Sequence, residues 1–222
     1  NVISQFCEAP DGNIWIATED GGLNLFNPKT GIFKSHFTPN FGYRNIHALL
    51  YEQDNLWIGS FSKGLYVYNT RNGKVRNYRY EKGNPHSIPN DHIYSIFQTK
   101  KGSIYLGTLS GFCIYRPKTD TFETIKGLKN IFIYDITEDR FGNLWLASKG
   151  DGIWRYEPKN RKLHNYRHST TNSHSPNSNW VIRVYTDHKQ NLWFCTEGGG
   201  FCRYNYQTDS FQNYSTPENL PN

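Results

Sequence analysis

The chain has 222 residues, of which 16% are aromatic and only 20% are charged, so the burial of rings must supply most of its hydrophobic driving force. This composition excludes a disordered chain, and the formal charge of +6 is spread over the sequence rather than gathered on one helix or stripe, which argues against nucleic-acid binding. The sequence contains neither a basic leader followed by an apolar stretch nor an 18-residue apolar run, so we expect no signal peptide or membrane span within it.

One succession of short strand signals recurs five times along the chain. In chain order, an apolar segment comes first, at residues 3–6, 46–50, 93–97, 133–136 and 181–185. A second segment reads Asn, Leu or Ile, Trp, apolar, small, Thr or Ser, at residues 12–18, 55–60, 102–108 (a degenerate copy with Tyr105 for Trp), 142–148 and 191–196. A glycine-containing turn then leads to a third segment that ends in a ring: Phe26, Tyr68, Tyr115, Tyr156 and Tyr204. A short fourth segment carries spaced apolar residues: Val75 and Tyr78, Phe122 and Ile125, Leu163 and Tyr166, Phe211 and Tyr214.

The spacing of these copies predicts a β-propeller. The Trp positions lie 40 to 48 residues apart, which is the period of a propeller blade. Four strand signals in each copy match a blade of four antiparallel strands. We therefore expect an all-β fold of five blades, at residues 1–40, 41–90, 91–129, 130–177 and 178–216, with residues 217–222 beginning the connection to a further blade.

The hairpin between the second and third segments allows a prediction of register, because the numbers of opposed residues have a constant sum. We place a ring opposite a ring, which also sets a small residue opposite a larger one in most copies, as cross-strand packing favours. The predicted pairs are Trp15 with Phe26, Trp57 with Tyr68, Tyr105 with Tyr115, Trp145 with Tyr156 and Trp193 with Tyr204. The same register puts Cys195 opposite Cys202; a disulfide bond between them is one hypothesis, and two free thiols are the other.

These phrases closely resemble the two-component regulator propeller repeat, whose hallmark is a turn, Asn, Leu-Trp, apolar, Gly-Thr, then Gly-Gly-Leu, then a Tyr followed by Asn-Pro and Thr-Gly. The best copies lie at residues 11–31 and 141–158. The resemblance implies a larger propeller of about seven blades, whose other blades or a second protomer would contact this segment. It also implies a location: the segment would belong to the periplasmic, extracytoplasmic sensor region of a hybrid two-component regulator. Such a regulator is a dimeric protein anchored in the inner membrane. Such sensors detect oligosaccharides derived from glycans and relay the signal to a histidine kinase.

One face of the blades is the candidate ligand-binding face. In a propeller, the connections that enter each blade and the loops between its second and third strands meet at the same face. Aromatic faces together with planar polar groups bind sugars. The candidate ligand-binding residues on this face are Tyr43, Arg44, His92, Lys149, Asp151, Trp180, Arg183 and Glu197, and ordinary exposed loops are the alternative interpretation.

The sequence shows no catalytic constellation. None of the eight histidines lies in a Ser, His, Asp or paired-carboxylate setting, and the four cysteines lack the spacing of a zinc site. We therefore expect a non-catalytic segment without catalytic residues, metal or cofactor. Two alternatives stay open. A propeller-type polysaccharide lyase or glycoside hydrolase would use the acidic loop residues Glu19, Asp20, Asp151 and Glu197. A protein-interaction or dimerisation scaffold would use the extended faces of the blades.

Overall fold

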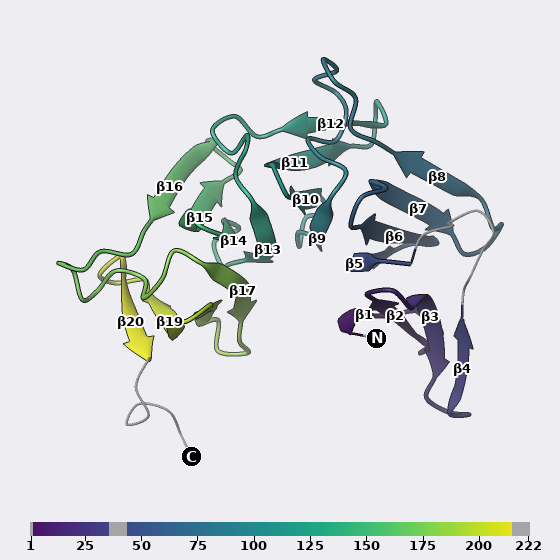
Figure 1. Ribbon diagram of the computed structural model, residues 1–222, viewed down its shortest axis with the longest axis horizontal. Helices are drawn as coiled ribbons and strands as arrows, with labels where there is room; N and C mark the ends of the chain where they lie inside the picture. Colours follow the sequence, from purple (N-terminus) through teal and green to yellow (C-terminus); the bar gives the residue numbers. More distant parts are fainter. Residues whose placement is uncertain (1, 36–43, 215–222) are drawn as a thin grey trace.

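The computed structural model describes residues 2–35 and 44–214, and this part of the chain consists of strands joined by turns and irregular connections. It contains twenty strands in five four-stranded antiparallel sheets, each made of four consecutive strands. Figure 1 shows the sheets as blades fanned around a common axis in an open arc, with the first strand of each blade innermost and blades 1 and 5 at the two ends. The prediction of an all-β propeller with four-stranded blades is confirmed.

The strands run from the axis to the rim in chain order. Blade 1 holds β1 (Ile3–Glu8), β2 (Ile14–Thr18), β3 (Gly22–Asn27) and β4 (Ile32–Ser35). Blade 2 holds β5 (Ile46–Glu52), β6 (Asn55–Ser60), β7 (Leu65–Asn69) and β8 (Val75–Tyr78). Blade 3 holds β9 (Ile93–Gln98), β10 (Ile104–Thr108), β11 (Gly111–Arg116) and β12 (Thr121–Thr124). Blade 4 holds β13 (Ile133–Glu138), β14 (Leu144–Ser148), β15 (Gly152–Glu157) and β16 (Lys162–Tyr166). Blade 5 holds β17 (Val181–Thr186), β18 (Leu192–Thr196), β19 (Gly200–Asn205) and β20 (Ser210–Tyr214).

The predicted register of the second hairpin is wrong by one residue in every blade. Trp57 lies opposite Val67, Trp145 opposite Arg155 and Trp193 opposite Arg203. The corresponding partner is Leu25 for Trp15 and Ile114 for Tyr105. Because neighbouring residues of a strand point to opposite faces, the shift puts the two rings of each predicted pair on different faces of the blade.

The turn chemistry explains this register. In each blade the hydroxyl of the last residue of the second strand donates to the carbonyl of a glycine at the start of the third strand or directly before it, for example from Ser148 Oγ to Gly152 O over 2.7 Å. The equivalent donors are Thr18, Ser60, Thr108 and Thr196. Gly152 has a φ of 77°, which a residue with a Cβ adopts only under strain. The loop therefore fixes the register, and ring pairing within the hairpin does not.

The rings pair across the blade boundaries instead. The second-strand ring of each blade contacts the third-strand ring of the next blade, and the four pairs are Trp15 with Tyr68 (6.4 Å between ring centres), Trp57 with Tyr115 (4.9 Å), Tyr105 with Tyr156 (6.5 Å) and Trp145 with Tyr204 (4.4 Å). These second-strand rings are all buried. Burial and ring geometry together therefore hold successive blades against each other.

The two cysteines of blade 5 are not opposed. Cys195 lies opposite Phe201 and Cys202 lies opposite Phe194, so the two thiols are on different faces of the sheet. Cys195 is exposed, Cys202 is fully buried, and both are free thiols. The geometry that the disulfide hypothesis required is absent, because that hypothesis depended on the incorrect register.

Candidate functional site

A β-bulge occurs at the same place in the inner strand of every blade. In blade 4, Ile133 pairs with Ser148 and Asp135 pairs with Ala147, so Tyr134 has no partner in the ladder. The ladders of the other four blades shift at the equivalent position. The bulged residues are Ser4, His47, Tyr94, Tyr134 and Ile182. Bulges redirect a side chain and are common beside functional sites, and these five lie on the strands nearest the axis (Figure 1).

The bulged residues of blades 2, 3 and 4 begin a row of rings that runs from blade to blade around the axis. The ring centres of His47 and Tyr94 are 5.0 Å apart, and those of Tyr94 and Tyr134 are 5.2 Å apart. Rings from the adjoining loops extend the row: Phe61 lies 5.4 Å from His47, His92 lies 4.8 Å from Phe61, and Phe132 lies 4.5 Å from Tyr94. We call these six residues the axial row: His47, Phe61, His92, Tyr94, Phe132 and Tyr134.

Charged groups flank the axial row. The Arg183 guanidinium carbon lies 5.9 Å from the ring centre of Tyr134. Burial lowers the pKa of His47, Glu19 acts to raise it, and His92 and Arg183 lower it further. The imidazole is therefore neutral at pH 7, and its Nε2 is buried without a hydrogen-bond partner in the described part of the chain. The row thus offers ring faces next to the exposed guanidinium group of Arg183, a combination that suits a hydroxylated ring.

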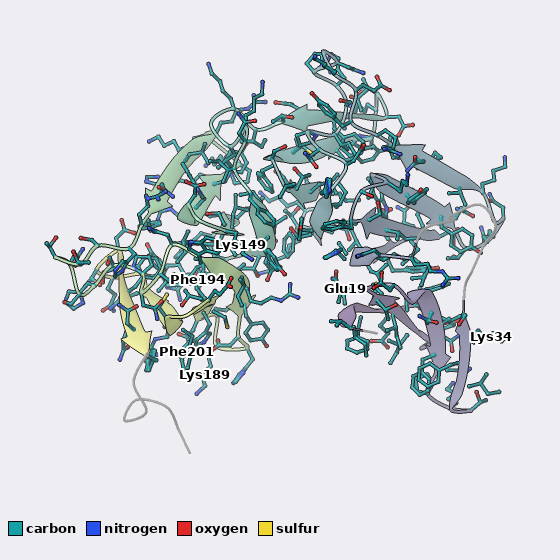
Figure 2. All side chains as sticks on the ribbon, in the orientation of Figure 1. Glu19, Lys34, Lys149, Lys189, Phe194 and Phe201 are labelled. Atoms are coloured by element: carbon teal, nitrogen blue, oxygen red, sulfur yellow. The ribbon has the colours of Figure 1, made fainter. Side chains whose placement is uncertain are left out.

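A second cluster lies on the same face between blades 4 and 5. Lys149 forms an isolated bridge with Trp180, and its ammonium group is 5.2 Å from the centre of the half-exposed indole. The same ammonium group lies 3.4 Å from the Glu197 carboxylate. Figure 2 shows Glu19 and Lys149 on the inner side of the arc, in blades 1 and 4.

The structure thus brings together some of the predicted site residues and separates others. His92 belongs to the axial row, Arg183 flanks it, and Lys149, Trp180 and Glu197 form the second cluster. Asp151 instead pairs with Arg167 over 2.8 Å. The backbone carbonyl of Arg44 accepts a hydrogen bond from Gly22, and Tyr43 lies outside the described residues.

Of the six members of the axial row, only His92 is among the residues predicted from the sequence. The other five are the bulged residues His47, Tyr94 and Tyr134 and the loop residues Phe61 and Phe132. The available signal was variation within the repeat. The bulged position holds Ser, His, Tyr, Tyr and Ile in the five copies, whereas the residue before it is always Ile or Val.

Two of the four acidic loop residues are engaged by cationic groups. The Glu197 carboxylate lies 3.4 Å from the Lys149 ammonium group, and the Asp151 carboxylate lies 2.8 Å from the Arg167 guanidinium group. Within residues 2–35 and 44–214, no group of three or more His, Cys, Asp or Glu residues could hold a metal ion. No helix in the same residues is long and apolar enough to cross a membrane.

The sequence matches a protein-family model described as the two component regulator propeller, at residues 1–20, 87–110 and 127–150. It is also 30% identical over 164 residues to histidine kinase P4 of Formosa agariphila. That alignment covers 69% of this chain and 11% of the kinase, so the chain spans about a tenth of this relative.

Solved propellers share the fold. An extracellular domain of a hybrid two-component system from B. thetaiotaomicron has a TM-score of 0.81 at 20% identity, over 97% of this chain and 30% of that one. The extracellular domain of a one-component system from the same organism has a TM-score of 0.74 at 21% identity, over 100% and 34% of the two chains. Virginiamycin B lyase from Staphylococcus aureus has a TM-score of 0.74 at 14% identity, over 97% and 70%. At these identities the likeness extends to the fold alone.

Proposed function

Since this chain carries two-component regulator propeller repeats, we propose that it is a non-catalytic segment of the periplasmic sensor region of a hybrid two-component regulator. The similarity to a histidine kinase and to the extracellular domains of two-component systems supports this assignment. The segment recognises an oligosaccharide derived from a glycan, and the signal passes to a histidine kinase module of a membrane-anchored, dimeric parent.

The axial row is the observation that carries the proposed ligand class. Three bulges place the side chains of His47, Tyr94 and Tyr134 on adjacent inner strands, with Phe61 37% exposed beside them. Sugars present C–H faces that pack on rings and hydroxyl groups that bond to planar polar groups. Arg183, which is exposed, supplies such a group next to the rings.

The inner strands also offer a route for the signal. The residue after the bulge is bonded to the backbone of the next blade at two boundaries. Gln5 Oε1 accepts from the N–H of Leu49 over 2.9 Å, and Asp135 Oδ2 accepts from the N–H of Val184 over 3.0 Å. A ligand that displaces a bulged side chain therefore acts on the position of the neighbouring blade as well as its own.

Isothermal titration of the intact sensor with a panel of purified neutral and acidic oligosaccharides tests this function. Once a ligand is found, Phe61→Ala should weaken binding about fivefold, because a lost ring contact is worth about 1 kcal/mol. Phe141→Ala is the matched control, since Phe141 is 67% exposed in the β13–β14 turn, outside the axial row.

The two parts of the proposal fail differently. If no oligosaccharide binds and none changes kinase output in cells, the glycan-sensing function is wrong. If an oligosaccharide binds and the two alanine variants bind it equally well, the sensor function stands and the axial row is not its site.

A further inference from the structure

Hydrogen bonds at the outer rim join blade 2 to blade 3. From blade 2, the Tyr78 hydroxyl and the Arg76 guanidinium donate to Asp120 Oδ1 of blade 3, over 2.5 Å and 3.1 Å. Tyr115 of blade 3 donates to the same oxygen over 2.6 Å. Asp120 is the fourth residue of the turn between β11 and β12, where its φ is 55°. We call this arrangement, in which a turn aspartate accepts from the preceding blade, the boundary latch.

The boundary between blades 4 and 5 repeats the boundary latch. Tyr166 of blade 4 donates its hydroxyl to Asp209 Oδ1 over 2.6 Å, and Arg155 of the same blade lies 3.4 Å from that oxygen. Tyr204 of blade 5 also donates to Asp209. Asp209 occupies the same turn position as the aspartate of blade 3, with a φ of 49°. The positive φ belongs to the turn itself, because Arg161 of blade 4 shares it, and aspartate adopts this region more readily than most residues with a Cβ.

The boundary between blades 3 and 4 carries the opposite charges. Blade 3 has Ile125 where the latch donors have tyrosine, and it presents the carboxylate of Glu123. The turn position of blade 4 is Arg161, with a φ of 59°, and its guanidinium lies 3.4 Å from that carboxylate. The turn residue of each of these three blades therefore complements the charge that the preceding blade presents.

The outer face of blade 5 carries the same donor set as blade 4. Trp193 lies opposite Arg203, as Trp145 lies opposite Arg155, and Tyr214 occupies the position of Tyr166 at the end of the fourth strand. The ladder pairs of the two blades define these equivalences, since Tyr166 lies opposite Ile153 and Tyr214 lies opposite Phe201. Arg203 bonds to Gln212 over 2.8 Å and meets no carboxylate among the described residues.

The rings on this face lack the cover that other blades have. Trp193 is partly exposed, whereas Trp145, packed on the next blade, is fully buried. Phe201 and Tyr214 stack with centres 5.0 Å apart beside it, and Tyr185 is 64% exposed. Figure 2 shows Phe201 near the open end of the arc.

We infer that the outer face of blade 5 docks a further blade of the same repeat type. That blade brings a ring at the end of its third strand, which covers Trp193. It also brings an aspartate at the fourth position of the turn between its third and fourth strands, which accepts from Tyr214 and Arg203. The interface continues the one that blades 4 and 5 already form. Blade 1 of a second copy could not form the boundary latch here, because its turn position is Gly31, which has no acceptor side chain.

A six-blade chain tests this inference. Residues 1–214 are followed by a second copy of residues 167–214, so that the natural sequence after Tyr166 now follows Tyr214. The matched control carries Asp209→Gly in the added copy only, which reproduces the turn of blade 1. Difference spectra against Trp193→Phe in the first copy isolate the emission of the original Trp193.

The added blade should shift the emission of the original Trp193 to shorter wavelength and raise the thermal midpoint above that of the 222-residue chain. The Asp209→Gly control should lose most of the rise in midpoint. A folded six-blade chain with unchanged Trp193 emission would overturn the inference. Equal thermal midpoints for the six-blade chain and its Asp209→Gly control would also overturn it. Self-association of the 222-residue chain that covers Trp193 would assign the face to a second copy instead.

The existing boundary gives an independent test if the six-blade chain does not fold. Asp209→Gly in the 222-residue chain should lower the midpoint and shift Trp145 emission to longer wavelength, because the boundary latch between blades 4 and 5 is lost. An unchanged midpoint and unchanged emission would show that the aspartate does not select its neighbouring blade.

Discussion

Two equivalent tryptophans differ in one hydrogen bond, which predicts different costs for the same substitution. Trp57 and Trp145 occupy the same strand position in blades 2 and 4, and both side chains are buried. The Trp145 Nε1 donates to Asp139 Oδ2 over 2.8 Å, whereas the Trp57 Nε1 is buried without a partner in the described residues. Trp57→Phe and Trp145→Phe remove a similar volume, but only the second breaks a hydrogen bond to a carboxylate.

The magnitudes follow from these contacts. The smaller ring costs about 1 to 2 kcal/mol in either blade, from lost burial and a residual cavity. A hydrogen bond to a charged group adds roughly 1.5 to 3 kcal/mol. The low end applies to Asp139, because it also accepts from the backbone of Phe141 and from Asn143. Trp57→Phe in addition relieves an unpaired N–H, so we expect Trp145→Phe to cost about 2 kcal/mol more than Trp57→Phe.

Urea unfolding at pH 7, followed by circular dichroism, measures both variants against the unsubstituted chain. The comparison depends on the difference between two matched variants, so it tolerates an error in the shared cost of the smaller ring. If Trp57→Phe is as destabilising as Trp145→Phe, the assignment of Asp139 as a buried acceptor that stabilises the fold is refuted.

Three further predictions concern the rim, the thiols and the blade interior. Burial alone would raise the pKa of Asp209, but hydrogen bonds such as that from Tyr166 outweigh it and the pKa lies below its ordinary value. The urea midpoint of the native chain should therefore exceed that of Asp209→Asn by a constant amount from about pH 5 to 7. This excess should shrink as the pH falls below about 4, through the folded pKa. An excess that does not change with pH would contradict this. Ellman's reagent should modify Cys195 first, and the count of reactive thiols should reach four only after denaturation. A count of two reactive thiols after denaturation would support the disulfide hypothesis instead. Gly107→Ala should lower stability by about 1 to 3 kcal/mol, because its Cβ would lie 2.8 Å from Ile133 Cγ2, and an unchanged urea midpoint would refute this close packing.

The blades could be predicted from the sequence because five copies of one strand succession share a period. The register could not, because ring-to-ring pairing within a hairpin is only one of several favourable arrangements. Ser148 and Gly152 show what decided it: a hydroxyl bonded to the carbonyl of a positive-φ glycine. The true ring partners, such as Trp145 and Tyr204, belong to different blades, and a hairpin argument considers only one blade at a time.

The candidate site was predicted in part for a related reason. Lys149 and Trp180 were found because loop positions were expected to meet at one face, and they do meet. The bulged residues Tyr94 and Tyr134 were assigned to ordinary inner strands, because alternation of apolar and polar residues does not show where a ladder skips a residue. Their direction depends on that skipped pair, which only the structure shows.

The two places where the blades differ most have the same physical origin. The bulged position has no ladder partner, so the inner sheet does not restrict its side chain, and it varies from Ser4 to Tyr94. The turn position has a positive φ in every blade and projects at a boundary, so it varies among Gly, Asp and Arg according to the blade before it. The buried rings between these positions can stay nearly constant, because they only hold blade against blade. A propeller of this type can therefore change the side chains that it presents at the axis and at the rim without changing its core.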